Sequence, residues 1–371
     1  MIPIICVVGA RPNFMKIAPI LRALSAYPDH FKPILVHTGQ HYDHKMSDVF
    51  FSDLDMPRPD EFLGVGSGSH ATQTAKILVA FEEVLLRVKP GLVLTVGDVN
   101  STLACSIAAK KLHIKIAHVE AGLRSNDRAM PEEINRIVTD SISDYFYTTE
   151  PSGDQNLIAE GQPADNIVRV GNCMIDTLFH LLPKAEKPEG LIAEPGKFGL
   201  VTLHRPSNID NEAVLRGLIE TLSDISKTLP LVWSIHPRTE KRLEEFGMKE
   251  AVEYNEAIQL LPPLGYLQFL WLTKHTAIAF TDSGGLQEET TALGIPCLTI
   301  RQNTERPVTI TEGSNRLIGN APDKLLEAFQ DFLNSETTSS AKTKQVPELW
   351  DGRAAERIAA DLMKRFFPDE A

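Results

Sequence analysis

The sequence predicts an α/β protein of two domains that face each other across a cleft. Strand-like apolar runs alternate with amphipathic helical stretches along the chain, which favours βαβ units and parallel sheets. A stretch rich in proline, glycine and charge near residues 171–197 indicates a domain boundary. A chain of 371 residues has room for two domains of ordinary size.

The expected strands are short apolar runs bounded by turn residues. They lie at residues 4–8, 34–37, 92–96, 116–119, 145–148, 199–203, 231–235, 278–281 and 297–300. Helical patterns lie at residues 15–25, 72–88, 211–228, from after Gly285 to about 293, and at 352–367. The last helix could belong to either domain. In parallel sheets, ligands bind beyond the carboxyl ends of the strands, and the motifs below all lie at such ends.

Composition indicates a soluble globular protein, with 43% hydrophobic and 23% charged residues. No apolar run reaches the roughly 18–20 residues that span a bilayer, and the first residues lack the basic start of a secretory signal. We therefore expect a cytoplasmic protein with no membrane contact. The formal net charge of −12 argues against a general nucleic-acid binder.

Cysteine and histidine spacing argues against a metal site. Cys6, Cys105, Cys173 and Cys297 are far apart in apolar contexts, which predicts buried thiols. The histidines lack carboxylate or cysteine partners at ligand spacing. The sequence also contains neither a GxGxxG fingerprint nor a Walker motif, so it does not indicate a dinucleotide or ATP site.

A strand, a tight turn and a helix over residues 277–293 form the pattern of a nucleotide seat. The turn is Ser283-Gly284-Gly285, where missing side chains let backbone N–H groups at a helix start approach an anion. Glu288 and Glu289 follow about one turn into the helix, where a carboxylate could bind sugar hydroxyls beside a phosphate.

The first strand also ends in an anion-binding pattern. Gly9 allows a tight turn, and Arg11 and Lys16 lie near the following helix start. An ordinary turn with solvated cations fits the same residues. After the strand 92–96, Asp98 suits either a helix cap or a catalytic acid.

Three carboxylates gather near the strand 116–119. Glu120 follows an apolar strand, where burial would raise its pKa towards that of a proton-transfer group, unless it forms a buried pair with Arg124 or a neighbour. Glu132 and Glu133 begin a helix and could be partners of its dipole, and Glu132 could pair with Arg136.

Two histidines follow strands in the second half of the chain. His204 precedes Arg205, and His236 lies two residues before Arg238, so both could point into one polar cleft. The segment from Arg301 to Arg306 could add a polar wall to the same pocket.

Seven motifs together resemble the non-hydrolysing UDP-N-acetylglucosamine 2-epimerases. In chain order they are GARPNFMKIAP (9–19), GDVNST (97–102), HVEAGLRS (118–125), PEEINR (131–136), LHRPSN (203–208), DSGGLQEE (282–289) and TERP (304–307). The resemblance spans residues 4 to about 319 in the family's order. It implies the glycosyltransferase-B fold, which consists of two Rossmann-like domains. In this fold the C-terminal helix crosses back to the first domain. We place these parts at residues 1–170 (catalytic carboxylates), 171–350 (UDP binding) and 351–371 (the returning helix).

The resemblance implies interconversion of UDP-GlcNAc and UDP-ManNAc, with neither NAD nor metal as cofactor. C2 of the sugar carries no activating carbonyl, so the family uses elimination. A base takes the C2 proton as UDP leaves C1, which gives 2-acetamidoglucal, and UDP then adds back while a proton reaches the other face of C2. We expect the product to supply ManNAc-type sugars for surface polysaccharide, and the protein to be a homodimer.

Residue roles follow from the motifs. The catalytic residues implied are Asp98, Glu120, Glu132 and His204, with Glu120 and Glu132 transferring protons at C2. The residues implied to bind substrate or UDP are Arg11, Lys16, Arg136, His236, Ser283, Gly284, Gly285, Glu289 and Arg306. Among these, the 283–285 turn would hold phosphate and Glu289 the ribose, while His204 and Arg11 would stabilise the diphosphate. Which carboxylate acts on which face of C2 stays open.

One departure from the family concerns a second, activating UDP-GlcNAc that many bacterial members bind. Their QHRxM-type segment reads Gln40-His41-Tyr42-Asp43 here, residues 64–70 contain no arginine, and the HRRE(N/S) run is altered to residues 204–208. Gln40, Glu133, Arg205 and His236 remain. We therefore predict that the enzyme needs no substrate activator.

Four other functions fit parts of the pattern. The nearest is a 2-epimerase of a modified sugar, such as a 2,3-diacetamido uronate. A UDP-sugar glycosyltransferase of the same fold would need no base at C2. A hydrolysing epimerase would release free ManNAc, and a non-catalytic binder would leave three clustered carboxylates without a purpose.

Overall fold

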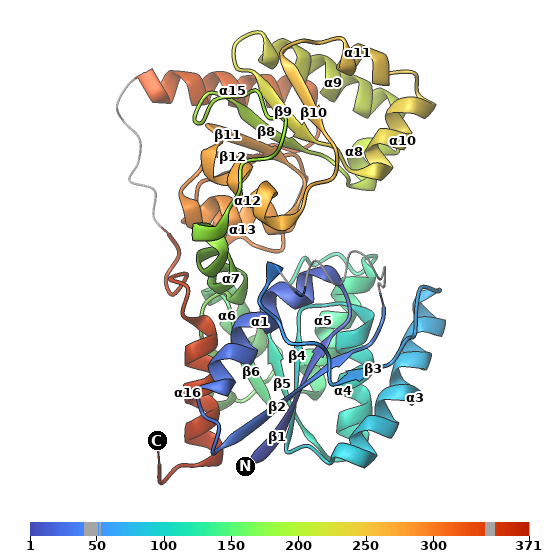
Figure 1. The fold of residues 1–371 in the computed structure, drawn as a ribbon, viewed down its shortest axis with the longest axis vertical. Helices are drawn as coiled ribbons and strands as arrows, with labels where there is room; N and C mark the ends of the chain where they lie inside the picture. The colour runs from blue at the N-terminus through green and yellow to red at the C-terminus, as the bar shows by residue number, and fades with distance from the viewer. Residues whose placement is uncertain (41–50, 52, 338–345, 371) are drawn as a thin grey trace. The chain divides into compact units, whose positions relative to one another are not determined.

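The computed structural model describes residues 1–40, 51, 53–337 and 346–370. Contacts divide the chain into two compact units, Met1–His180 with Glu348–Ala371, and Leu181–Pro347. The first unit thus includes most of the helix after residue 171, whereas the predicted border falls before it. Each unit contains one parallel sheet with helices on both faces (Figure 1).

The first unit has a seven-stranded sheet in the order β3-β2-β1-β4-β5-β6-β7. Its strands are β1 (Ile2–Val8), β2 (Phe31–His37), β3 (Glu61–Phe62), β4 (Leu92–Val96), β5 (Lys115–Val119), β6 (Tyr145–Thr148) and β7 (Ile167–Arg169). Its helices are α1 (Arg11–Ser25), α3 (His70–Val88), α4 (Asn100–Lys111), α5 (Pro131–Ile142), α6 (Pro151–Ala159), α7 (Cys173–Leu181) and α16 (Ala354–Phe366), with a 3-10 turn, η1 (Ala164–Asn166).

The second unit repeats this order over six strands, as β10-β9-β8-β11-β12-β13. Its strands are β8 (Gly199–Thr202), β9 (Leu231–Ser234), β10 (Ile258–Leu261), β11 (Ile278–Thr281), β12 (Cys297–Thr299) and β13 (Asn315–Leu317). Its helical segments are η2 (Leu182–Lys184), α8 (Pro206–Ile209), α9 (Glu212–Ser226), α10 (Pro237–Glu245), α11 (Lys249–Glu253), α12 (Tyr266–His275), α13 (Gly284–Leu293), α14 (Val308–Thr311) and α15 (Pro322–Thr337).

The apolar strands are buried on both faces because successive side chains point to opposite sides of a sheet. In the second unit, Val201 packs into the core that α9 and α15 cover, while its neighbour Leu200 packs into the core under α12 and α13. In the first unit, Ile5 and Val93 pack against α3 and α4. The predicted α/β architecture of two Rossmann-like parts is confirmed.

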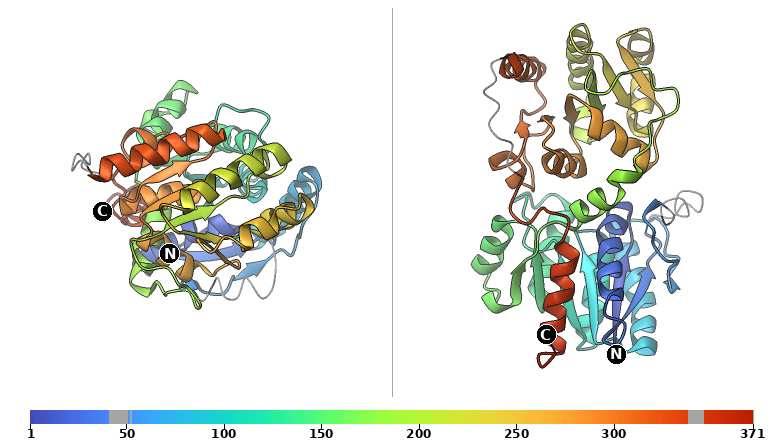
Figure 2. Two further views of the ribbon diagram at one scale, coloured as in Figure 1. Left: turned by 90° about the horizontal axis from the view of Figure 1, so that it is seen from above. Right: turned by 60° about the vertical axis from the view of Figure 1, so that its left-hand side comes forward.

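Helix α16 belongs to the first unit although it comes last in the chain. In the right-hand view of Figure 2 it runs, in red, beside α1, and the two helices are in contact. Asp176 of α7 caps it: the Asp176 carboxylate accepts the N–H of Ala354 at 3.0 Å and of Ala355 at 2.7 Å. The Trp350 indole N–H donates to the Thr149 carbonyl at 3.0 Å just before it. A remote side chain therefore supplies the cap that the helix's own N-cap residue, Arg353, does not provide.

All four cysteines are buried with free thiols, as predicted. Each of the described helices is too short or too polar to span a lipid bilayer.

Candidate active site

Both sheets reverse their strand order between a first strand and a fourth. These points lie between β1 and β4 in the first unit and between β8 and β11 in the second. Loops leaving the carboxyl ends of strands at such a switch point form the usual ligand site of this architecture. Most of the predicted site residues follow these four strands or their neighbours.

Glu120 lies at the end of β5 in a strained conformation. Its backbone φ is 68°, a left-handed value that residues other than glycine seldom adopt. Only 6% of the residue is exposed. Its Oε2 forms an ion pair with the Lys16 Nζ of α1. A Cβ on Gly97 would lie 3.3 Å from each of these two atoms, so glycine lets the turn after β4 approach the pair. The alternative pairing of Glu120 with Arg124 is wrong, because Arg124 binds two other carboxylates.

Asp98 forms an ion pair with Arg136 of α5, between Asp98 Oδ2 and Arg136 Nη1. It is not a helix cap, since α4 follows Val99 and has no side-chain capping bond. The Asn135 side chain of α5 donates to the Asp98 carbonyl at 2.8 Å. Helix α5 therefore holds both the side chain and the backbone of Asp98.

The two neighbouring glutamates of α5 have different environments. Glu133 is buried and accepts the N–H groups of Ser125 at 3.0 Å and Asn126 at 2.9 Å. Burial alone would raise its pKa, but these bonds and Arg136 lower the pKa below 4.5 overall. Arg136 therefore pairs with Glu133. The pairing of Glu132 with Arg136, which the sequence allowed, is wrong. Glu132 is half-buried and makes no hydrogen bond or ion pair with the described residues.

Arg11 begins α1, but its side chain lies outside the described part of the structure. Its predicted role at the diphosphate stays a prediction. Within α1, the backbone start is held by Asn13, whose side chain accepts the Ala10 N–H at 3.2 Å and donates to the Val96 carbonyl at 2.8 Å.

In the second unit, Asp282 organises the residues around His204. Asp282 is fully buried and accepts the N–H groups of His204, at 3.0 Å, and Arg205, at 2.9 Å. The His204 Nδ1 lies 3.1 Å from Asp282 Oδ1. Burial lowers the pKa of His204 below 6.5, and Arg205 among other cations adds to this effect, while Asp282 opposes it. The motif at residues 282–289 contains Asp282, but the sequence predicts no role for it, because an aspartate after a strand looks like any turn residue.

Cationic groups collect near His204. The His204 and His236 rings lie with centroids 5.5 Å apart, and His236 Nδ1 accepts the Arg238 N–H at 3.1 Å. Buried donors at Arg205 Nε and Arg301 Nη1 have no hydrogen-bond partner among the described residues. Buried donors without protein acceptors are suited to an anionic ligand.

The Ser283–Gly285 turn opens onto α13 as predicted. The helix begins at Gly284, and its N-cap Ser283 makes no side-chain capping bond, so the first N–H groups remain available to an anion. A Cβ on Gly285 would meet nothing within 4 Å. The helix ends at Gly294, whose left-handed φ of 68° suits glycine.

The acidic pair in α13 is divided between two partners. Glu289 Oε1 accepts the Tyr266 hydroxyl at 2.9 Å, and Glu288 Oε1 lies 2.5 Å from Arg306 Nε. Arg306 also pairs with Glu305 at 2.8 Å. Arg306 therefore joins the 304–307 segment to the helix of the predicted nucleotide seat.

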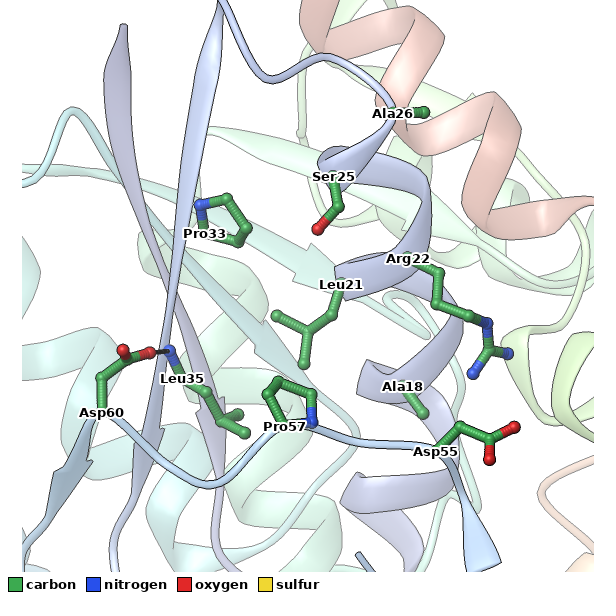
Figure 3. Close-up of a pocket in the computed structure, with 10 residues that line it drawn as sticks. All are labelled: Ala18, Leu21, Arg22, Ser25, Ala26, Pro33, Leu35, Asp55, Pro57 and Asp60. Atoms are coloured by element: carbon green, nitrogen blue, oxygen red, sulfur yellow. Dashed lines mark hydrogen bonds between the residues drawn. The ribbon is translucent and has the colours of Figure 1, made fainter. Parts of the chain in front are cut away.

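A separate cavity of about 420 Å³ lies in the first unit between α1, β2 and residues 55–60 (Figure 3). None of the predicted site residues lines it. Its charged residues already have partners: Asp60 accepts the Leu35 N–H at 2.8 Å, and Arg22 donates to the Leu54 carbonyl at 3.3 Å. Among the described residues, no three His, Cys, Asp or Glu side chains form a group that could hold a metal ion.

The first unit places carboxylates at the carboxyl end of its sheet, and the second unit places buried donors and a histidine at the carboxyl end of its own. The family model described as UDP-N-acetylglucosamine 2-epimerase matches residues 22–363. The chain belongs to this family, and it is an isomerase-type enzyme.

Relatives with this fold are similar over almost their full length. A UDP-N-acetylglucosamine 2-epimerase of Methanocaldococcus jannaschii is 41% identical, over 96% of this chain and 97% of that protein. Its crystal structure in complex with UDP-GlcNAc and UDP has a TM-score of 0.86 at 40% identity, and covers 97% of this chain and 99% of that one. A UDP-2,3-diacetamido-2,3-dideoxy-D-glucuronate 2-epimerase of Pseudomonas aeruginosa is also 41% identical, over 97% of this chain and 99% of that protein.

Proposed function

We propose that the protein interconverts UDP-GlcNAc and UDP-ManNAc without hydrolysing the nucleotide sugar. Family membership supports the reaction class. The observation that carries the proposal is the buried Glu120–Lys16 pair beside Gly97, in which a strained backbone holds a carboxylate next to the switch point between β1 and β4. Strain of this kind is retained mostly at functional sites.

The reaction proceeds by elimination and re-addition of UDP. The C2–H bond and the C1–O bond break, so that UDP leaves with the electron pair of the C1–O bond and the sugar becomes 2-acetamidoglucal. Glu120 and Glu132 are the groups that exchange protons with C2, and Arg136 holds Asp98 in an ion pair. Glu132 is suited to proton transfer because no described residue occupies its carboxylate.

The second unit retains UDP between the two half-reactions. The first N–H groups of α13 bind a phosphate, and Glu289 binds the ribose. His204, held by Asp282, faces the negative charge that develops on the leaving diphosphate. Retention of UDP explains why the nucleotide sugar is re-formed rather than hydrolysed.

NMR of UDP-GlcNAc with the protein in deuterated water tests this function. We expect deuterium at C2 together with a UDP-ManNAc signal. Glu120→Gln should abolish the exchange and leave UDP binding by calorimetry largely intact. Transfer of the sugar to an acceptor without C2 exchange would instead indicate a glycosyltransferase.

A second substrate has specific support, because the Pseudomonas aeruginosa relative acts, by its name, on a diacetamido uronate and is as similar as the Methanocaldococcus jannaschii enzyme. Comparison of kcat/KM for the two UDP-sugars decides between them. A hundredfold preference for the uronate would overturn the assignment to UDP-GlcNAc.

We also propose that no second UDP-GlcNAc is needed as an activator. Residues 41–43 lie outside the described part of the chain, but Gln40 is buried and its Oε1 accepts the Ser101 N–H at 3.1 Å and hydroxyl at 2.7 Å. Glu133 is likewise engaged by Ser125 and Asn126. His236 accepts the Arg238 N–H, so three of the four residues left from the activator set have internal partners. A lag with pure UDP-ManNAc that a trace of UDP-GlcNAc removes would contradict this.

We further propose that the enzyme works as a homodimer in the cytoplasm and supplies ManNAc-type sugars for surface polysaccharide. Sedimentation analysis checks the first statement. Loss of ManNAc from surface glycans in a deletion strain checks the last.

A further inference from the structure

A fully buried histidine links the segments that carry Asp98, Glu120 and Glu132. His118 lies in β5 with no exposed surface. Its Nδ1 lies 2.6 Å from Asp140 Oδ1 of α5, and its Nε2 lies 2.8 Å from the carbonyl oxygen of Gly97. One imidazole therefore joins β5, α5 and the turn after β4.

Both nitrogens of this ring have an acceptor oxygen within hydrogen-bond distance. A carbonyl oxygen can only accept, so Nε2 donates to Gly97. Burial would raise the pKa of Asp140, but the charges and hydrogen bonds of His118 and Arg124 lower it overall. Nδ1 faces this carboxylate, so one ring bridges a buried acidic side chain and a backbone carbonyl.

The other oxygen of Asp140 extends the linkage to the loop after β5. Asp140 Oδ2 accepts the Gly122 N–H at 3.0 Å and lies 2.7 Å from Arg124 Nη2. Arg124 in turn binds Glu160 at the end of α6 through two bonds of 2.8 and 2.6 Å. Asp140, the partner of His118, therefore holds the backbone just after Glu120, and His118 itself lies two residues before Glu120.

We propose that His118 is a positioning residue for the reaction, which fixes the Gly97–Asp98 turn, the Glu120–Gly122 loop and helix α5 relative to one another. It does not touch substrate, and it acts through Asp98, Glu120 and Glu132. The inference rests on the proposed function for the roles of these carboxylates. Misplacement of reacting groups by about 1 Å can cost on the order of a hundredfold in rate, so the linkage acts mainly on kcat.

Variants that keep volume and change donors test the role. His118→Phe removes both ring nitrogens, whereas Asp140→Asn keeps the shape of the side chain and can still accept from Gly122 but removes the negative charge beside His118. Asp154→Asn is the matched control, because Asp154 is a partly buried carboxylate of the same unit bound to Arg169 at 2.8 Å and outside this linkage.

We expect ¹⁵N NMR of labelled histidines to show hydrogen bonds at both His118 nitrogens in the wild type and a changed Nδ1 signal in Asp140→Asn. We expect His118→Phe and Asp140→Asn to lower kcat and C2 exchange at least about tenfold, with KM and UDP affinity within about twofold. Asp154→Asn should change neither. If His118→Phe does not fold, Asp140→Asn and the ring signals decide.

A His118 ring that is hydrogen-bonded at only one nitrogen, or a folded Asp140→Asn variant with wild-type kcat, would overturn the positioning role. A wild type whose His118 ring is hydrogen-bonded at both nitrogens but which shows no C2 exchange would instead overturn the proposed function. The two failures are therefore distinguishable.

Discussion

Gly97 is where backbone geometry and the candidate chemistry meet at the residue scale. Its φ is 65°, and a Cβ there would press on both partners of the Glu120–Lys16 pair. Gly97→Ala should therefore lower kcat and C2 exchange by about tenfold or more, beyond the backbone cost of about 1–2 kcal/mol.

Gly161→Ala is the control, because Gly161 has a φ of 86° but nothing within 4 Å of the added Cβ. Steady-state rates and thermal unfolding of both variants separate the two effects. Equal loss of kcat in both would show that the contact with the ion pair is irrelevant.

His204 should take up a proton when UDP binds. Its pKa lies below 6.5, so at pH 7 the ring is mainly neutral in the free protein. A bound diphosphate raises the pKa of a nearby imidazole, because it favours the charged form. Calorimetry of UDP binding in two buffers of different ionisation enthalpy measures the uptake. His204→Gln should take up fewer protons than the wild type, and identical uptake would contradict the assignment.

At the scale of elements, α16 depends on Asp176 of α7. Asp176→Ala removes the acceptor for two N–H groups, which costs about 1 kcal/mol and should speed amide exchange in residues 354–366 about fivefold. Asp176→Asn keeps an acceptor and should have a smaller effect. Hydrogen–deuterium exchange of peptides from this helix measures both, and unchanged protection in the alanine variant would exclude the capping role.

The same carboxyl gives a pH dependence of defined sign. Burial is the main cause that raises the pKa of Asp176 above 3.8, and the charge of Asp351 adds to it. The hydrogen bonds from the N–H groups of Ala354 and Ala355 lower the pKa but do not cancel this effect. The folded state then holds the proton more tightly than the unfolded state, so stability falls as pH rises from about 3.8 through the raised pKa and is constant above it. Exchange in Asp176→Asn should lack this step.

The central apolar strands could be predicted from the sequence, and the edge strands could not. The predicted runs at 92–96, 145–148 and 278–281 match β4, β6 and β11 residue for residue. The sequence missed β3, β7, β10 and β13, which have two to four residues and in part carry polar side chains such as Glu61 and Arg169. Their strand character comes from pairing with a neighbour, which a local pattern does not contain.

Site residues divide in the same way. Motif order pointed to Glu120 and Glu289, but the partners Lys16 and Tyr266 are distant in sequence and become visible only in the fold. The His118–Asp140 pair was missed because a histidine within an apolar strand looks like an ordinary core residue.

At the scale of the whole molecule, the chain leaves the first unit after His180 and re-enters it at Glu348. A fragment of residues 181–347 contains a complete sheet and its core, and we expect it to unfold cooperatively by itself. A fragment of residues 1–180 lacks α16 and exposes the surface against which Ile358, Leu362 and Met363 are buried. We expect it to aggregate.

Joining residues 1–180 to 348–371 by a flexible linker should restore a folded first unit. Circular dichroism and thermal melts of the three fragments check this. A stable fragment of residues 1–180 would show that the last helix is dispensable.

This path has a consequence for biosynthesis. A ribosome synthesises residues 181–347 before α16, so the first unit cannot complete its fold until the last segment of the chain has been made. The Tyr147 hydroxyl can donate to the Asp361 side chain, at 2.8 Å, only after translation has passed that residue. Nascent chains that end at residue 347 and are held on the ribosome by an extension that fills the exit tunnel should therefore be protease-resistant in the second unit and sensitive in the first.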